Sequence, residues 1–246
     1  MTDARDIWEE YARSDPFWSI AGSDKYRIGQ MDENARDEFF LSGREHVEEI
    51  WEVFESRIGR GFSPSTSIDY GCGVGRILFP LAERSVNAVG VDISQGMLDG
   101  VRANSPSDLH DKIRLQTSDE FLTAGADRYD LVHSYIVMQH IESRTGYEII
   151  RRLVERLNER GLGMLHVTYQ ATAGALRRVA SRVYRDVPAA YRLRTIFDRE
   201  AGPYIPMYEY NLKTVEYILS ENACEIFARR ETDHGHLGTM FFFQKQ

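Results

Sequence analysis

The sequence predicts an α/β protein with a doubly wound, mixed sheet and helices on both faces. From Thr66 onward, β-like apolar runs alternate with helical runs, which is the pattern of a parallel sheet. A glycine-rich loop at 71–75 joins the first of these strands to the first of these helices. Near the end of the chain, two β-like runs follow each other across a short turn, which predicts an antiparallel pair.

The composition is that of an ordinary globular protein. The 246 residues, of which 42% are hydrophobic and 28% charged, can form one large domain with a substantial core, so we treat 1–246 as a single domain. The formal net charge of −8 disfavours nucleic acid as a partner, although several arginines gather between residues 177 and 194.

The cysteines, the N-terminus and the lengths of the apolar runs indicate where the protein is located. Cys72 and Cys224 lie outside any CxxC or metal-ligand pattern, so we expect two reduced thiols. The charged N-terminus predicts no signal peptide, and no apolar run approaches the length of a membrane span. We therefore expect a cytoplasmic protein with no membrane partner; a homodimer is one arrangement that the sequence allows.

Residues 1–62 are expected to be helical with a break. Ile7, Trp8 and Tyr11 share one helical face, and Pro16 stops the turn before it. Aromatic residues are frequent here and in the segment 171–210, which is too long for an ordinary connection. We interpret 1–62 as an N-terminal helical lid and 171–210 as a substrate-lid insertion; the alternative is that the aromatic rings only close the helices over the sheet.

The elements between these segments and after them follow from local periodicity. Strands are predicted at 66–70, 87–93, 112–118, 129–137 and 161–169, and helices at 75–84, 94–105 and 146–161. A helix at 211–222 and strands at 224–231 and 239–245 complete the chain. Ser94 and Asn211 are the predicted N-caps of their helices.

The glycine loop predicts a ligand site. Ligands of doubly wound sheets bind at the carboxyl ends of the strands, and glycines there permit positive φ angles and close approach to the backbone. Asp92 ends the next strand, about twenty residues downstream, where a carboxylate can accept hydrogen bonds from a ribose diol. The alternative for the glycine loop is a turn that only connects the strand to the helix. The alternative for Asp92 is a negative charge that stabilises the start of the following helix.

At this point the sequence resembles the class I S-adenosylmethionine (SAM)-dependent methyltransferases. The matching segments are "IDYGCGVGR", "VGVDISQGML", "TSDEF", "YDLVHSYIVMQHI" and "RGLGMLHVTY", which occur in the family's order. The resemblance implies a seven-stranded sheet in the order 3-2-1-4-5-7-6 with an antiparallel last strand, and SAM as the cofactor. The spacing GxGxG, in place of GxGxxG, and the presence of Asp119 disfavour NAD.

The resemblance also implies which residues contact SAM. The expected cofactor-binding residues are Asp69, Gly71, Cys72, Gly73, Asp92, Ile93, Met97, Ser118, Asp119 and Ile136. The loop and Asp69 would line the methionine moiety, Asp92 the ribose, and Asp119 the adenine amino group. Met97 is equally compatible with a plain core position.

A methyl acceptor with an O–H or N–H group needs a base, and His140 is the first candidate. It follows the fourth strand at the expected substrate edge, and it resembles a histidine that phosphoethanolamine methyltransferases use with a tyrosine. Tyr11 or Tyr26 could complete such a pair. The alternative is that His140 only packs the loop.

Other histidines are weaker candidates. His236, with His234, lies in the turn before the last strand, which faces the same edge; the alternative is a solvated pair. No carboxylate cluster accompanies them, so no metal is expected. His133 and His166 lie within strands, where a hydrogen-bonded core histidine is the better interpretation.

The expected function is therefore SAM-dependent methyl transfer to an oxygen or nitrogen of a small molecule, such as a sugar or another natural-product intermediate. The alternatives are a protein or RNA methyltransferase, a SAM-binding module without activity, and an NAD-dependent enzyme. The sequence does not distinguish the acceptor.

Overall fold

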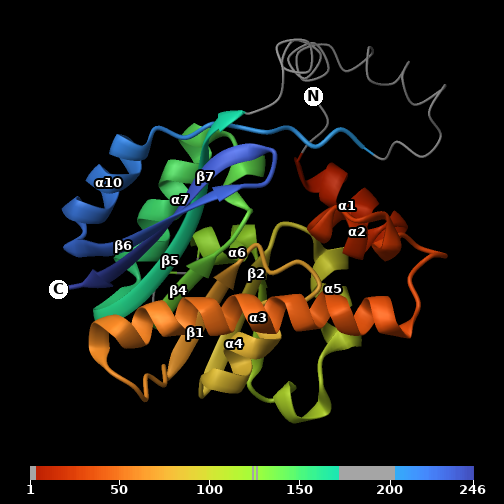
Figure 1. Ribbon diagram of the computed structural model, residues 1–246, viewed down its shortest axis with the longest axis horizontal. Coiled ribbons are helices and arrows are strands. Elements are labelled where there is room, and N and C mark those ends of the chain that lie inside the picture. The colour runs from red at the N-terminus through yellow and green to blue at the C-terminus, as the bar shows by residue number, and fades with distance from the viewer. Residues whose placement is uncertain (1–3, 124, 126, 172–202) are drawn as a thin grey trace.

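A seven-stranded sheet runs through the computed structural model, which describes residues 4–123, 125, 127–171 and 203–246 (Figure 1). The strands are β1 (Thr66–Tyr70), β2 (Asn87–Asp92), β3 (Ile113–Thr117), β4 (Tyr129–Ser134), β5 (Leu157–Ala171), β6 (Cys224–Asp233) and β7 (His236–Lys245). Their order is β3-β2-β1-β4-β5-β7-β6, and β7 is antiparallel to both of its neighbours. The order and the antiparallel strand implied by the resemblance are confirmed.

The strand ends differ from the prediction in three places. β4 ends at Ser134, three residues early, because Ile136 adopts a left-handed conformation with φ of 59° that no strand can contain. β5 begins at Leu157, inside the predicted helix, since Leu157 already pairs with Tyr129 across an irregularity in the ladder. The final hairpin is longer than predicted and leaves only residues 234–235 between its strands.

Three helices cover one face of the sheet. They are α3 (Glu33–Ile58), α4 (Leu78–Arg84) and α5 (Gln95–Asn104). Val47, Ile50 and Phe54 of α3 pack against β4, β5 and β7, and α4 and α5 share a second apolar cluster with β2. Much of α3, which the sequence placed in the lid, therefore packs on the sheet itself.

The helices of the opposite face are α6 (Ser118–Thr123), α7 (Ser143–Glu155) and α10 (Leu212–Glu221). Their apolar residues join the largest buried cluster, in which Phe121, Leu153 and Leu219 meet the strands. Because both faces are covered, the central strands are apolar on both sides, as in other parallel sheets. The predicted N-caps are confirmed: Ser94 accepts a hydrogen bond from the Met97 amide, and Asn211 from the Lys213 amide.

The two short N-terminal helices are α1 (Ala4–Ser14) and α2 (Pro16–Ala21). Pro16 does break the helix as predicted, and it also opens α2, because the first helical turn needs no N–H from it. α1 packs against α5 (Figure 1), where the Glu9 carboxylate accepts hydrogen bonds from the Gln95 and Gly96 amides at the helix N-terminus.

Three short 3-10 helices complete the described elements, at Asp24–Tyr26 (η1), Ser107–Leu109 (η2) and Met138–His140 (η3). Most of the expected lid insertion, with Tyr184, Tyr191 and the arginine-rich stretch, lies outside the described residues. Its last part is described: the Tyr208 amide bonds to the Gln139 carbonyl and the Tyr210 amide to the Thr168 carbonyl. Within the described ranges, no helix has the length and apolar character that a bilayer crossing requires.

A glycine holds α3 against the loop that follows β1. A Cβ atom at Gly43 would lie 1.9 Å from the Arg76 carbonyl oxygen, which is far inside contact distance. We predict that Gly43→Ala lowers the free energy of unfolding by about 1–3 kcal/mol, the usual cost of overpacking, measured by urea denaturation.

Helix propensity by itself predicts the opposite sign, since alanine favours a helix interior by about 1 kcal/mol over glycine. The exposed Glu52→Ala on the same helix is the control and should change stability by less than about 0.5 kcal/mol. A Gly43→Ala variant as stable as the parent would contradict the close approach.

Candidate functional site

The glycine loop has the backbone that the sequence predicted. Gly71, Gly73 and Gly75 have φ angles of 81°, 53° and 97°, all in the left-handed region. A Cβ at Gly71 would lie 2.2 Å from the side chain of Val137, and one at Gly73 would lie 2.6 Å from Ile20. The glycines thus let the protein's own side chains approach the loop, in addition to exposing its backbone.

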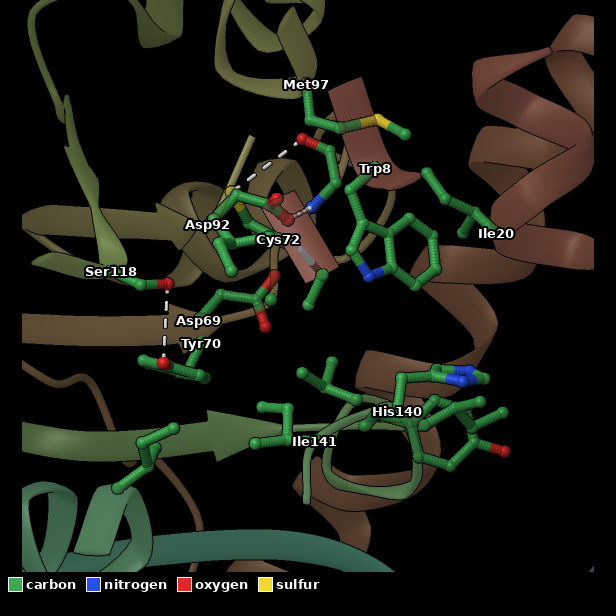
Figure 2. Close-up of a pocket in the computed structure, with 18 of the residues that line it drawn as sticks. Trp8, Ile20, Asp69, Tyr70, Cys72, Asp92, Met97, Ser118, His140 and Ile141 are labelled. Carbon is green, nitrogen blue, oxygen red and sulfur yellow. Dashed lines mark hydrogen bonds between the residues drawn. The ribbon is translucent and has the colours of Figure 1, made fainter. Parts of the chain in front are cut away.

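A cavity of about 430 Å³ lies at the carboxyl ends of β1, β2 and β4. All the residues expected to bind a cofactor line it, from Asp69 in β1 to Ile136 after β4, and His140 lines it as well. Figure 2 shows Asp69 and Asp92 on one side of the cavity, with the Trp8 indole and His140 facing it from the other. The fold therefore gathers residues from distant parts of the chain, including α1 and α2, around one space.

Asp92 is held by backbone amides at the end of β2. Its Oδ2 accepts a hydrogen bond from the Gly73 amide at 2.9 Å, and its Oδ1 accepts one from the Ser94 amide at 3.0 Å. Burial raises the pKa of Asp92 to about 6, and the amide hydrogen bonds oppose that rise. The carboxylate is thus fixed in orientation and ionised near neutral pH.

The end of the cavity near β3 combines apolar and polar groups. Met97 is buried there, beside Ile93, and the Tyr70 hydroxyl donates to Ser118 Oγ at 3.3 Å. Asp119 Oδ2 forms an ion pair with Arg5 of α1 at 2.7 Å. This contact joins α1 to the cavity wall, and the sequence did not predict it.

Asp69 belongs to a buried chain of hydrogen bonds. Its Oδ1 lies 2.8 Å from Nδ1 of His133 in β4, and His133 Nε2 lies 3.1 Å from His46 Nε2 in α3. Burial holds the pKa of His46 well below its ordinary value, so His46 is neutral. His133 is thus a hydrogen-bonded core histidine, as expected, and it fixes the orientation of the Asp69 carboxylate.

His140 lies in η3 between α1 and the segment after residue 202. Its Nδ1 lies 3.3 Å from the Pro206 carbonyl oxygen, and its Nε2 lies 3.1 Å from the side-chain amide nitrogen of Gln139. The His140 ring also packs edge-on against the Trp8 ring. Burial lowers the pKa of His140 to about 4. The neutral ring donates from Nδ1, so Nε2 carries the lone pair that a base needs and receives a hydrogen bond from Gln139.

The structure does not bring Tyr11 or His236 to the cavity wall. Tyr11 is buried among the rings of α1 and α2, and its hydroxyl donates to the Pro203 carbonyl at 2.7 Å. His236 is the first residue of β7 and pairs with Ala171 of β5, so it belongs to a strand and not to the loop in which it was predicted. Local sequence gave no sign of either arrangement, since both depend on segments far away in the chain.

A tyrosine–histidine pair at the cavity was missed. Tyr135 lines the cavity directly after β4, and its hydroxyl lies 3.0 Å from Nε2 of the exposed His234. The Tyr135 ring also stacks on His46, with centroids 4.1 Å apart. The apolar run around Tyr135 suggested a continuing strand, and only the left-handed Ile136 turns the chain at this point.

The comparisons with known proteins agree with this geometry. A family model described as a methyltransferase domain matches residues 68–162, from β1 into β5. No curated protein matches the chain in sequence.

Solved structures share the fold over nearly the whole chain. Magnesium protoporphyrin IX methyltransferase (ChlM) from Synechocystis PCC 6803, with bound S-adenosylhomocysteine (SAH), matches with a TM-score of 0.63 and 18% identity, over 98% of both chains. The N-methyltransferase NodS from Bradyrhizobium japonicum WM9, in complex with SAH, matches with a TM-score of 0.54 and 15% identity, over 94% of this chain and 98% of that one.

The sheet order and the domain match together define a class I methyltransferase fold. Residues 68–162, which match the methyltransferase domain model, contain the glycine loop, Asp92 and the end of β4. The chain as a whole shares the class I methyltransferase fold, as its sequence predicted.

The burial of His140 leads to a prediction about its titration. Its imidazole should remain neutral as the pH falls from 8 to 5 and should gain a proton only near pH 4, because the cavity disfavours the cation. The measurement is an NMR titration of the His140 Cε1–H signal, assigned by its absence in His140→Gln.

The same shift should make folding stability depend on pH. The unfolded chain takes up a proton at His140 below about pH 6.5, whereas the folded protein does so only near pH 4. This residue's contribution to stability is thus present above pH 6.5 and is lost as the pH falls from 6.5 to 4, so His140→Gln should flatten that part of the stability profile. A His140 signal that titrates above pH 6 would contradict the buried position.

Proposed function

We propose that the protein transfers a methyl group from SAM to an oxygen or nitrogen of a small-molecule acceptor. The observation that carries the proposal is the cavity itself, which unites the glycine loop, Asp69, Asp92 and the residues after β3 and β4 in one space. Both solved relatives were crystallised with SAH, and one is an N-methyltransferase while the other acts on magnesium protoporphyrin IX.

The groups that line the cavity suit each part of SAM. Asp92 keeps lone pairs for the ribose hydroxyls after it has accepted two amide hydrogen bonds. Apolar Ile93 and Met97 suit an adenine ring, with Ser118 and Asp119 at its polar edge. Asp69 and the loop amides suit the methionine moiety, and Ile136 suits the space beside the sulfur.

SAM, when bound, supplies an electrophilic methyl group on a positively charged sulfur. The chain's own residues then have to orient the acceptor, exclude water and accept a proton. Trp8 of α1 and Ile20 of α2 line the cavity, which supports our proposal that the lid within residues 1–62 consists of these two helices. The segment 171–210 remains our candidate for the other part of the lid, on the basis of Pro206 and Tyr208 in the cavity wall.

Two groups could accept the acceptor's proton. His140 offers Nε2 once the Gln139 hydrogen bond opens, but a pKa of about 4 makes it a weak base. Tyr135 offers a relay: its hydroxyl can take the proton while it passes its own to Nε2 of His234, which is exposed to solvent. Burial raises the pKa of Tyr135, so the phenol enters this relay protonated.

The test of the function is SAH release. The protein is incubated with SAM and with phenols, carboxylic acids, amines and sugars in separate reactions, and SAH is measured by mass spectrometry. A small molecule that supports turnover supports the proposal. Turnover only with RNA or a protein would favour an RNA or protein methyltransferase. SAM binding without turnover of any acceptor would favour a binding module. Tight binding of NAD, with no binding of SAH, would favour an NAD-dependent enzyme.

We also expect a cytoplasmic protein that acts on small molecules and neither on nucleic acid nor at a membrane. Two buried cysteines without a disulfide support a reducing compartment.

Asp92 gives the sharpest prediction for the cofactor. Asp92→Ala should weaken SAH binding at pH 8 by about 1–3 kcal/mol, because the ribose hydroxyls lose their acceptor. Isothermal titration calorimetry measures the change, and Asp99→Ala, an exposed carboxylate of α5 outside the cavity wall, is the matched control.

The pKa of Asp92 adds a pH dependence. Wild-type affinity for SAH should fall as the pH falls through about 6, since a protonated Asp92 accepts fewer hydrogen bonds. Equal SAH affinities for Asp92→Ala and the parent would remove this residue from the ribose site.

Three variants distinguish the candidate bases. If His140 is the base, His140→Gln should lower kcat at least about a hundredfold with little change in SAH affinity. If the relay operates, Tyr135→Phe should have that effect, and His234→Gln a smaller one because water can replace the exposed imidazole. Full activity in all three variants would show that the acceptor needs no base from these residues.

A further inference from the structure

Arg76 is a charged residue in the cavity wall with too few partners. It follows the glycine loop directly, and its side chain runs beneath α3, past Gly43. Its guanidinium bonds to the Ser42 hydroxyl at 3.3 Å and lies 5.9 Å from the centre of the Phe39 ring. Its Nε is shielded from solvent and has no hydrogen-bond partner within the part of the chain that the structure describes.

The charge of Arg76 also lacks a close counter-ion. Among the described residues, no carboxylate lies within 4.0 Å of its guanidinium, although many other arginines have such a partner. Asp69 attracts it from a greater distance, but Asp69 Oδ1 is already engaged by His133. Burial accordingly lowers the pKa of Arg76, which reflects the cost of holding the cation there.

The groups around Arg76 do not compensate for it. Tyr135 keeps its proton because burial raises its pKa, and the neighbouring His46 is neutral. Buried polar atoms are nearly always hydrogen-bonded, and buried charges are paired, so an unpaired guanidinium that faces a cavity points to a ligand. The planar fork of arginine matches a carboxylate or phosphate with two parallel hydrogen bonds.

We propose that Arg76 binds an oxyanion, a carboxylate or a phosphate, at the end of the cavity formed by Asp69 and Tyr135. This inference rests on the proposed function, which defines what the cavity holds. The oxyanion has two possible sources: the α-carboxylate of the methionine moiety, beside an Asp69 that suits its ammonium group, or an acidic group of the acceptor. In the second case the enzyme's substrates are small acids.

The first arm of the test addresses the cofactor. Isothermal titration calorimetry compares SAH with 5′-methylthioadenosine, which lacks the amino-acid tail, in the wild type and in Arg76→Gln. If Arg76 binds the cofactor's carboxylate, Arg76→Gln should weaken SAH binding about ten- to a hundredfold and leave 5′-methylthioadenosine binding unchanged. Arg102→Gln, an exposed arginine of α5, is the matched control.

The second arm addresses the acceptor. SAH-loaded protein is titrated with benzoate, phenyl phosphate and the neutral benzamide, and binding is followed by NMR chemical shifts. If Arg76 binds an acidic acceptor, benzoate or phenyl phosphate should bind to the wild type at least about tenfold more tightly than to Arg76→Gln, with benzamide much weaker. Whichever of the two binds better identifies the class of acid.

Arg76→Lys is a second variant that tests the proposal even if Arg76→Gln fails to fold. It keeps the charge without the planar fork, so it should bind the oxyanion more weakly than the wild type and better than Arg76→Gln. The proposal is overturned if Arg76→Gln or Arg76→Lys binds SAH as the wild type does and the wild type shows no preference for either acid over benzamide. A wild type that binds no SAH at all would instead overturn the proposed function.

Discussion

The site depends on the loop after β1, in which three glycines lie close to three side chains from other parts of the chain. Val137, Ile20 and Phe79 each lie where a Cβ of Gly71, Gly73 or Gly75 would stand. The same three positions have positive φ angles, which L-residues adopt only at a cost. A side chain at Gly71, Gly73 or Gly75 would clash with the segment after β4, with α2 or with α4 respectively, so the shape of the cavity depends on this turn.

Hydrogen bonds within the protein orient the carboxylates of the cavity. Backbone amides hold both oxygens of Asp92, and a histidine from the next strand holds Asp69. The Asp92 carboxylate is buried at a cost that its hydrogen bonds offset only in part, as its raised pKa shows. A ligand that supplies the missing hydrogen bonds gains affinity because the protein has no reorganisation to undergo.

The N-terminal helices complete the site through contacts that span much of the chain. Arg5 of α1 reaches Asp119 after β3, Glu9 caps α5, and Trp8 meets His140 after β4. α1 thus contacts the loops after β2, β3 and β4 at once.

Local signals in the sequence were enough for the glycine turn and the caps Ser94 and Asn211, because each depends on residues within a few positions of one another. The strand order and the residues that line the cavity from Asp69 to Ile136 were implied by the resemblance to the methyltransferase family, and they agree with the rule that parallel strands bring their carboxyl ends to one edge. Only the tertiary structure decided where β4 ends, that Tyr135 meets His234, that His46 joins His133 and Asp69, and that the half-buried Arg76 has no close counter-ion among the described residues. These features join residues from separate elements, and no periodicity within either element encodes the partner that packing brings to it.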